Sequence, residues 1–259
     1  MKREPTGEWF ASISIETGDD PPAKPDSPER CVGIDVGILK FAHDTDGFAL
    51  GPLNLSNERN RLDRERRKLS RKEHGSNNWE KQRRKVARRH ADLKRKRRDF
   101  LHRVSNYYAR EYDLVAVEKL DAKGLMELDG NSRNRASAAW GTFRRMLAYK
   151  CEREGTHFAA VDPEGTTKEC AKCGAETDKP LWVREHSCPA CGFEADRDAN
   201  AAGNILSRGL DQVGVVHPES TPSETATAVG TAVSAVSASR VIEQGSPALN
   251  ERASASRAG

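Results

Sequence analysis

The chain has 259 residues, of which 32% are charged and 36% hydrophobic, with a net charge of +4 and a mean hydropathy of −0.78. This composition allows one good-sized domain with insertions, or two small domains, and leaves enough apolar material for one substantial core. A run of ~18 apolar residues is absent, and the first five residues lack the apolar stretch of a secretory signal. We therefore expect a soluble, cytoplasmic protein with no membrane partner.

The first part of the chain contains strand patterns. Residues 8–16 alternate apolar and polar side chains, which predicts a half-buried strand, and a proline-rich linker follows at 19–28. Residues 31–36 form a short, nearly continuous apolar run, typical of a buried central strand. Residues 41–42 and 48–50 have the pattern of the next two strands, joined by a turn at 44–47.

From residue 56 the pattern changes to that of a helix, interrupted at 75–78. Beyond the interruption an apolar or aromatic residue recurs every seven positions, which predicts a long amphipathic helix and one half of an antiparallel hairpin over 56–111. We interpret this stripe as packing rather than as a base-stacking surface. Its members are Trp79, Val86, Leu93, Phe100 and Tyr107.

The same segment concentrates positive charge. Between residues 59 and 103 there are 20 Lys and Arg against 6 Asp and Glu, a local charge of +14, so the rest of the chain carries −10. A basic block of this density favours a polyanionic partner, although charge runs are also found on solvated helical surfaces. The candidate nucleic-acid-binding residues are Arg83, Arg84, Lys85, Arg88, Arg89, Lys94, Arg95, Arg97 and Arg98.

The remaining chain alternates strands and helices. We expect a buried strand at 114–118, a Gly-, Asn- and Arg-rich loop at 130–135, a helix over 136–154, a strand at 157–161 and a helix over 198–206. The predicted helix at 136–154 has one apolar side. Residues 210–259 are rich in Ser, Ala, Thr and Val without periodicity, which predicts a disordered tail. The apolar side of the helix consists of Trp140, Phe143, Leu147 and Cys151.

Four of the six cysteines form two Cys-x2-Cys pairs separated by 14 residues: Cys170, Cys173, Cys188 and Cys191. Two such turns can complete a tetrahedral shell of four thiolates, which suits Zn²⁺ and leaves no open coordination position. We therefore predict a structural zinc ribbon over 166–193. A redox dithiol or plain buried cysteines are the alternatives, and His186 could replace one ligand. The isolated Cys31 and Cys151 are expected to be buried thiols.

Three carboxylates are candidates for catalysis: Asp35 lies within an apolar strand, where an unpaired charge is expensive, Glu118 lies at the end of another such strand, and Asp198 opens a helix. If they converge, they repel one another unless cations lie among them. Two Mg²⁺ or Mn²⁺ ions ~4 Å apart would satisfy that charge and support phosphodiester hydrolysis. Taken singly, Asp35 could cap a turn, Glu118 could pair with Lys119 or a basic helix, and Asp198 could be an N-cap.

In combination these features resemble the TnpB (OrfB) family of transposon-encoded proteins. The similarity lies in Gly-Ile-Asp-Val-Gly at 33–37, Val-Ala-Val-Glu-Lys-Leu at 115–120 and Asp-Arg-Asp-Ala-Asn-Ala-Ala-Gly-Asn-Ile at 196–205, which resemble three RuvC motifs. The ribbon with its lead-in at 166–170, residues 139–144 and the basic hairpin also match, over roughly 31–209 in all.

The resemblance implies an α/β, RNase H-like (RuvC) fold with a mixed sheet over 31–209, into which the basic helical hairpin and the four-cysteine zinc ribbon are inserted. It implies an endonuclease linked to DNA transposition that cuts DNA matched by a bound guide RNA. By motif, Asp35, Glu118 and Asp198 are its catalytic ligands for Mg²⁺ or Mn²⁺, with Asp196 as second choice for the third. About 30 residues precede the first motif, where the family has well over a hundred. Residues 1–30 therefore resemble the last strand of a lost wedge barrel plus a linker, and we expect a truncated copy or a misplaced start.

Two other hypotheses stay open. A catalytically inactive remnant or RNA-associated regulator would bind nucleic acid in a salt-sensitive way, without metal-dependent turnover. A zinc-ribbon module of the transcription or translation machinery is disfavoured by the three acids.

Overall fold

The computed structural model describes residues 1–16, 18, 20–120, 139–180 and 182–215. These form two compact units, one of residues 1–20 with 53–102 and the other of residues 21–52 with 103 onward. The predicted loop at 130–135, the first residues of the predicted helix at 136–154 and residues 216–259 of the predicted tail lie outside the described residues. The prediction that disorder begins at residue 210 is wrong, because residues 210–213 form the last turn of a helix. None of the helices described is both long and apolar enough to span a membrane.

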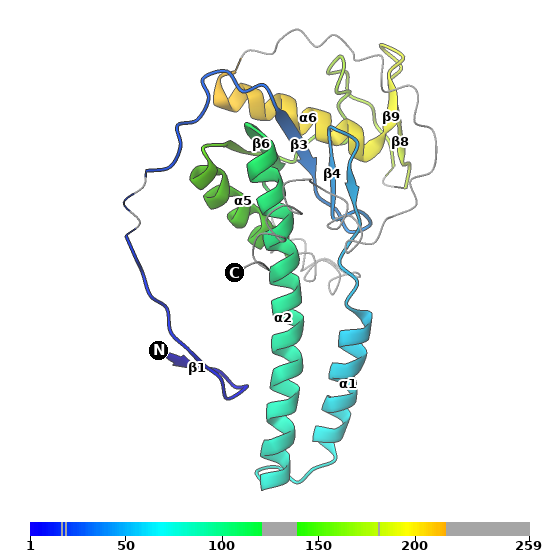
Figure 1. The fold of residues 1–259 in the computed structure, drawn as a ribbon. Coiled ribbons are helices and arrows are strands. Elements are labelled where there is room, and N and C mark those ends of the chain that lie inside the picture. The colour runs from blue at the N-terminus through cyan, green and yellow to red at the C-terminus, as the bar shows by residue number, and fades with distance from the viewer. Residues whose placement is uncertain (17, 19, 121–138, 181, 216–259) are drawn as a thin grey trace, which may run out of the picture. The chain divides into compact units, whose positions relative to one another are not determined.

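The first unit contains the predicted helical hairpin. Helix α1 (Ser56–Ser70) lies beside helix α2 (Asn77–Glu111) (Figure 1). The first helix begins at residue 56 and the second ends at residue 111, as the sequence predicts. Between the helices, the amide nitrogen of Gln82 donates to the backbone oxygen and the carboxylate of Glu65, at 3.1 and 2.6 Å. Leu62 is buried. Residues of α2 after 102 belong to the second unit.

The prediction of a half-buried strand over residues 8–16 is wrong. Within this range only Trp9–Phe10 (β2) forms a strand, and it pairs with the two residues Lys2–Arg3 (β1). The side chains of Trp9 and Ile13 are 67% and 84% exposed. The apolar side chains of residues 8–16 alternate with polar ones, as in a strand with one buried face. The partner strand β1 has only two residues, so it forms no sheet face that could bury these apolar side chains.

The second unit is built on a five-stranded mixed sheet in the order β5-β4-β3-β6-β7. β3 is parallel to β6, and β6 to β7, while β3-β4 and β4-β5 are antiparallel. All five strands occur where the sequence predicts them, and the mixed α/β class is confirmed. The bounds are β3 Cys31–Asp35, β4 Ala42–Asp44, β5 Ala49–Leu50, β6 Leu114–Glu118 and β7 His157–Val161.

Helix α6 (Arg197–Val213) packs directly on one face of this sheet (Figure 1). Two glycines make the close approach possible. A Cβ atom at Gly33 of β3 would lie 2.2 Å from the backbone oxygen of Ala202, and one at Gly209 would lie 2.4 Å from the Cβ of Ala116 on β6. The helix therefore crosses from β3 to β6 at van der Waals contact with both strands.

The C-terminal end of α2 and helix α5 (Trp140–Glu154) contact each other, and α2 also contacts the face of the sheet opposite α6. The Tyr108 hydroxyl of α2 donates to Asp44 at 3.0 Å, and Lys150 of α5 donates to Ser105 of α2 at 2.8 Å. Because side chains alternate along a strand, Asp44 points to the face opposite His43. The predicted apolar side of α5 is confirmed: Trp140, Phe143, Leu147 and Cys151 are all buried.

Replacing Gly33 with Ala should destabilise the second unit. The added methyl group meets backbone atoms of α6, which cannot rotate away as a side chain can, so the helix must shift off β3. Overpacking of this kind typically lowers the free energy of unfolding by about 1–3 kcal/mol. Urea unfolding measures the change. Gly203→Ala is the matched control, since its nearest neighbour is a single methyl group at 3.0 Å; equal stability of the two variants would contradict the expected contact.

Candidate metal centres and nucleic-acid interface

The four predicted zinc ligands come together. Their sulfur atoms all lie within 4.8 Å of one another, the one such set of three or more potential metal ligands in the described part of the chain. The Sγ atoms of Cys170 and Cys191 are 3.7 Å apart, and those of Cys173 and Cys188 are 3.6 Å apart. A tetrahedron with Zn–S bonds of about 2.3 Å has S–S edges of about 3.8 Å, whereas a disulfide requires about 2.05 Å. The spacing therefore fits a bound zinc ion and no disulfide.

The two Cys-x2-Cys turns have the same backbone geometry. Gly174 donates its amide to the oxygen of Cys170 at 2.8 Å, and Gly192 donates to that of Cys188 at 2.9 Å. Both glycines have φ near +70°, a conformation that side-chain-bearing residues rarely adopt. Hydrogen bonds from the amides of Cys191 and Ala190 help to lower the pKa of Cys188 to about 7, whereas hydrogen bonds among the neighbouring thiols help to raise the pKa of Cys173 to about 12.

The other cysteines and His186 lie outside this cluster. Lys179 donates to Nδ1 of His186 at 2.7 Å, so this ring has a different partner and does not replace a cysteine. Cys151 is buried as expected, but Cys31 is only half-buried. The second turn is extended by the hairpin of β8 (Glu185–Ser187) and β9 (Glu194–Asp196), which ends where α6 begins.

Two of the three predicted acids lie in one row on one face of the sheet. Ile34 pairs with Val117 in the parallel register of β3 and β6, so Asp35 and Glu118 are the next residues of neighbouring strands. Gly33 lies under α6, and side chains two residues apart share a face, so Asp35 points to the α6 side. Ala116 of β6 lies against Gly209 of α6, and Glu118 is two residues further along the same strand. Glu118 therefore also points to the α6 side of the sheet.

The third acid is brought to this row by α6. Asp198 is in the first turn of the helix, one turn before Ala202, which lies over Gly33. Its carboxylate accepts a hydrogen bond from Arg184 at 2.7 Å and lies 3.3 Å from Lys40. The N-cap is Asp196, whose carboxylate accepts from the Asp198 amide at 2.8 Å, so the alternative of Asp198 as N-cap is wrong.

Electrostatic coupling links the three carboxylates. Burial is the largest cause that raises the pKa of Asp35 to about 8, followed by the like charges of Glu118 and Asp198. Burial also raises the pKa of Glu118, against the opposing effects of Thr166 and Arg208. The three acids are thus close enough to repel one another, although their oxygens are not gathered as tightly as the four thiols.

Two asparagines of α6 attach the ribbon to the sheet. The side chain of Asn200 donates to the oxygen of Glu169 at 2.7 Å and accepts from the Ala171 amide at 2.9 Å. Asn204 donates to the oxygens of Thr166 and Glu169, both at 2.8 Å. The two asparagines of the Asp-Ala-Asn-Ala-Ala-Gly-Asn pattern at 198–204 therefore have a structural role, in addition to the candidate metal ligand Asp198.

Thr166 connects this attachment to the acidic row. Its hydroxyl donates to the Glu118 carboxylate at 2.8 Å, and both groups are buried. Glu118 therefore has a partner from the ribbon's lead-in, and the alternative in which it pairs with Lys119 is not observed among the described contacts. No local pattern in the sequence indicates this bond, because 48 residues separate its two ends.

Sequence reasoning also missed three groups around the acids: Lys40, Arg184 and His43. The first two pair with Asp198. His43 is the β4 partner of Asp35 in the antiparallel register. One available signal was that His43 directly follows the strand predicted at 41–42, which is next along the chain after the Asp35 strand.

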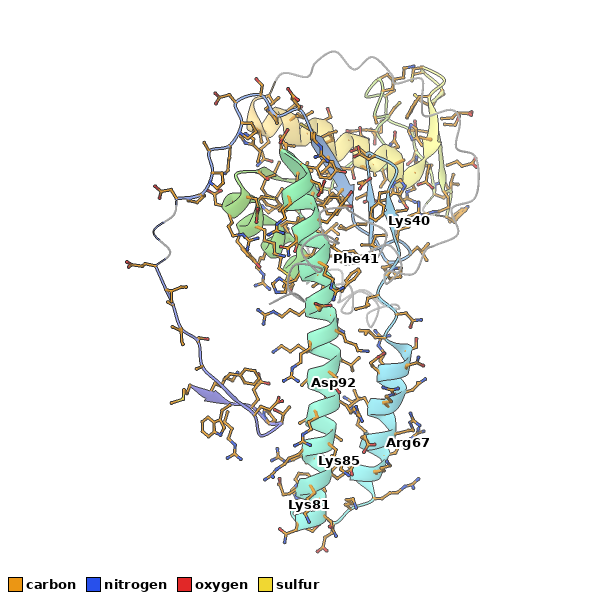
Figure 2. The ribbon with its side chains drawn as sticks, in the orientation of Figure 1. Lys40, Phe41, Arg67, Lys81, Lys85 and Asp92 are labelled. Atoms are coloured by element: carbon orange, nitrogen blue, oxygen red, sulfur yellow. The ribbon has the colours of Figure 1, made fainter. Side chains whose placement is uncertain are left out.

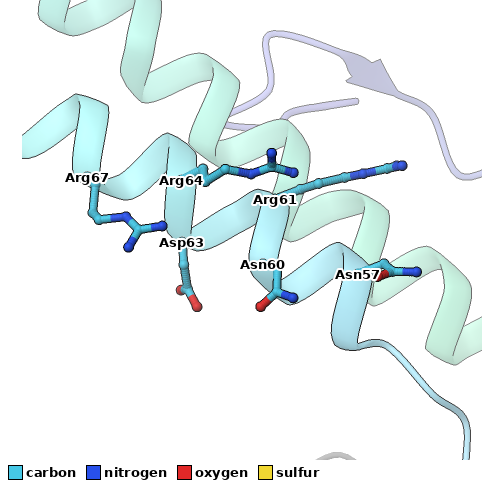
Figure 3. Close-up of a pocket in the computed structure, with 6 residues that line it drawn as sticks. All are labelled: Asn57, Asn60, Arg61, Asp63, Arg64 and Arg67. Carbon is cyan, nitrogen blue, oxygen red and sulfur yellow. The ribbon is translucent and has the colours of Figure 1, made fainter.

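The helical hairpin presents the predicted basic surface. Eight of the nine candidate residues are exposed, and the exception, Arg97, is half-buried with its Nε lacking a hydrogen bond among the described residues. Figure 2 shows Arg67, Lys81 and Lys85 pointing outward from the two helices. An open pocket on α1 adds amide and guanidinium donors (Figure 3). Its lining residues are Asn57, Asn60, Arg61, Asp63, Arg64 and Arg67.

Two family models match separate parts of the chain. Residues 12–129 match the OrfB model of insertion sequence IS605, described as "Probable transposase", and residues 140–205 match the model described as "Cas12f1-like, TNB domain". The resemblance to the transposon-associated TnpB (OrfB) family is thereby confirmed.

Curated relatives agree with this assignment. The chain is 38% identical over 213 residues to a "Putative RNA-guided DNA endonuclease" of Streptomyces pristinaespiralis, a match covering 81% of this chain and 52% of the relative. It is 33% identical over 220 residues to the "Putative RNA-guided DNA endonuclease InsQ" of Escherichia coli K12, covering 78% and 54%. The chain spans about half the length of these relatives.

Solved structures share the fold. A chain of a Cas12f1-sgRNA-target DNA complex matches with a TM-score of 0.50 and 21% identity, over 70% of this chain and 51% of the other. A CRISPR-Cas12f ternary complex matches with a TM-score of 0.52 and 21% identity, over 75% and 41%. At this identity the likeness concerns the fold.

Proposed function

We propose that this chain carries the nuclease domain of a DNA endonuclease of the RuvC type, with an RNase H-like sheet and a dependence on divalent metal. The observation on which the proposal rests is the placement of Asp35, Glu118 and Asp198. Three separate elements bring these acids to one face of the sheet, where burial, and after it the like charges of Glu118 and Asp198, raise the pKa of Asp35. The catalytic ligand set, Mg²⁺ or Mn²⁺ as the metal, and Zn²⁺ in the ribbon are parts of this proposal.

The donor set fits a hard divalent cation, which prefers carboxylate oxygens. When bound, such an ion supplies Lewis-acid stabilisation of the charge that builds up during phosphodiester hydrolysis. Asp35 and Glu118 would hold it from neighbouring strands, and Asp198 from the first turn of α6. Thr166 orients Glu118 through the bond at 2.8 Å, and Arg184 and Lys40 orient Asp198.

Nucleic acid is the partner class that the hairpin favours. Among the described residues, Arg84, Lys85 and Arg88 form no ion pair, so their charges are available to phosphates. The relatives' names include RNA-guided DNA endonuclease, and one structural neighbour is a complex with guide RNA and target DNA. We infer that the full activity of this family, RNA-guided cleavage of DNA associated with transposition, is the context in which the domain acts.

The proposal is tested by cleavage of supercoiled plasmid and single-stranded DNA in Mg²⁺ or Mn²⁺. The wild-type chain should nick DNA only with the metal, and Asp35→Ala and Glu118→Ala should remove the activity. Equal nicking by the wild type and both variants rules the proposal out. Salt-sensitive binding without metal-dependent turnover would instead support the inactive nucleic-acid-binding remnant.

Thr166→Val should impair cleavage by roughly 10–100-fold, because loss of a group that orients a metal ligand typically has an effect of this size. The substitution removes the hydroxyl that donates to Glu118 but keeps the branched shape. Thr166→Ser restores the hydroxyl and should restore most of the rate. Zinc content should not change, since Thr166 is not one of the four ligands. If valine and serine variants cut at the same rate, the hydrogen bond does not orient Glu118.

Neutralising three hairpin residues should weaken DNA binding and its salt dependence. In a variant with Arg84, Lys85 and Arg88 changed to Gln, the slope of log affinity against log salt should fall by up to about 0.9 for each duplex phosphate that the protein no longer neutralises. Fluorescence anisotropy across a salt series measures this. The control changes Lys24, Arg30 and Arg153, which already pair with Glu152, Glu111 and Glu154. Identical slopes for both variants would contradict a hairpin interface.

A further inference from the structure

His43 lies in the acidic row without any role in the site described so far. It is the direct antiparallel partner of Asp35, and partners across a strand pair point to the same face. The row therefore reads His43, Asp35, Glu118 across three neighbouring strands. Asp198 reaches the same place from α6, and the ring of His43 interacts with the Asp198 backbone.

The imidazole is buried and incompletely satisfied. His43 is only 7% exposed, and its Nδ1 atom has no hydrogen-bond partner among the described residues. A buried polar atom without a partner is unusual, because it forfeits its interaction with water and gains nothing in return. A neutral imidazole has one nitrogen that carries no proton, and this nitrogen binds metal ions in proteins through its lone pair.

We propose that His43 is a nitrogen ligand of the divalent ion held by Asp35, Glu118 and Asp198. This inference rests on the proposed function, because it requires a metal at the acidic row. It adds a ligand to the three carboxylates, and it explains why a strand residue opposite Asp35 is a buried histidine with a free nitrogen rather than an apolar side chain.

An imidazole ligand changes which metal the site prefers. Mg²⁺ favours oxygen ligands and retains water, whereas imidazole nitrogen suits first-row transition metals. A site with three carboxylates and one histidine should therefore bind Mn²⁺ more tightly than Mg²⁺. Without the histidine the site becomes all-oxygen, and the preference for Mn²⁺ should shrink.

The test is direct Mn²⁺ binding to the full chain loaded with one equivalent of Zn²⁺, followed by electron paramagnetic resonance. Pulsed measurements detect magnetic coupling between bound Mn²⁺ and an imidazole nitrogen, and competition gives the affinity for Mg²⁺. The variants are His43→Gln and Asp35→Asn. His157→Gln is the matched control, because this histidine of β7 contacts the backbone oxygen of Pro25 at 2.8 Å, and no acid of the row.

The wild type and His157→Gln should show nitrogen coupling. His43→Gln should lose it, with Mn²⁺ affinity falling by at least ~10-fold, the lower end of the range for loss of an outer partner of a ligand, and Mg²⁺ affinity falling much less. Mn²⁺ that binds in an Asp35-dependent manner without nitrogen coupling, or with unchanged affinity in His43→Gln, overturns the role of His43 and leaves the proposed nuclease site standing. Unchanged Mn²⁺ binding in Asp35→Asn overturns the metal site itself, and with it the proposed function.

Discussion

Asp35→Asn should abolish metal-dependent cleavage while making the metal-free chain more stable at neutral and alkaline pH. Loss of an outer partner of a metal ligand alone typically reduces affinity or activity about 10–100-fold, so loss of the ligand itself should reduce cleavage by more than about 100-fold. The amide keeps the shape of the carboxylate but not its charge, which separates the requirement for a ligand from the requirement for packing.

The gain in stability follows from the pKa of Asp35, which rises from an ordinary 3.8 to about 8 in the folded chain. The folded state then binds this proton more tightly than the unfolded state. The free energy of unfolding therefore falls as pH rises from about 4 to about 8, and is constant above that range. Asparagine cannot ionise, so the free energy of unfolding no longer falls with pH through this residue. The melting temperature should therefore rise by roughly 2–4 °C for each kcal/mol by which the free energy of unfolding exceeds that of the wild type.

Calorimetry at pH 6 and pH 9, with and without Mg²⁺, measures both effects. Mg²⁺ should stabilise the wild type at pH 9 and leave Asp35→Asn unchanged. Asp113→Asn is the control, because this carboxylate of the same unit accepts hydrogen bonds from the amides of Glu29 and Arg30 and has no place in the row. A melting temperature of Asp35→Asn that stays below the wild type at pH 9 would contradict the electrostatic repulsion inferred for the acids.

Removal of zinc should unfold the ribbon and disturb the acidic row. Structural zinc contributes about 10–16 kcal/mol of apparent binding free energy in small zinc domains, and such domains do not fold without it. In its described residues, the segment from Cys170 to Cys191 contains two turns and one short strand, β8, which pairs with β9 just beyond the segment. Cys173→Ser should therefore lower bound zinc from about one ion per chain to a small fraction.

The effect should extend to Glu118, because Asn200 and Asn204 bind backbone groups at 166–171 and Thr166 binds Glu118. Hydrogen exchange should show reduced protection at the amides of Gly174 and Gly192 and, more weakly, in the lead-in. Cys31→Ala should keep its zinc and serves as the control. Full zinc content and unchanged exchange in Cys173→Ser would contradict a four-cysteine site.

Local patterns determined most of the elements. Strands at 31–35 and 114–118 are short apolar runs, and the long α2 helix follows a seven-residue repeat, so period and polarity alone predict their type. The cysteine pairs were equally local: each Cys-x2-Cys turn is closed by a glycine a residue later. The strand prediction at residues 8–16 was wrong because no long neighbouring strand pairs with this segment.

The sequence by itself therefore determined the strands, the hairpin, the thiolate set and the three acids. Tertiary structure alone decided that β3 and β6 are parallel neighbours, that Gly33 and Gly209 let α6 lie on them, and that Asp196 caps the helix while Asp198 faces the row. It also placed Thr166 on Glu118 and His43 opposite Asp35. The physical reason is range: helix and strand periods act over a few residues, whereas electrostatic and metal sites depend on which distant segments share a face.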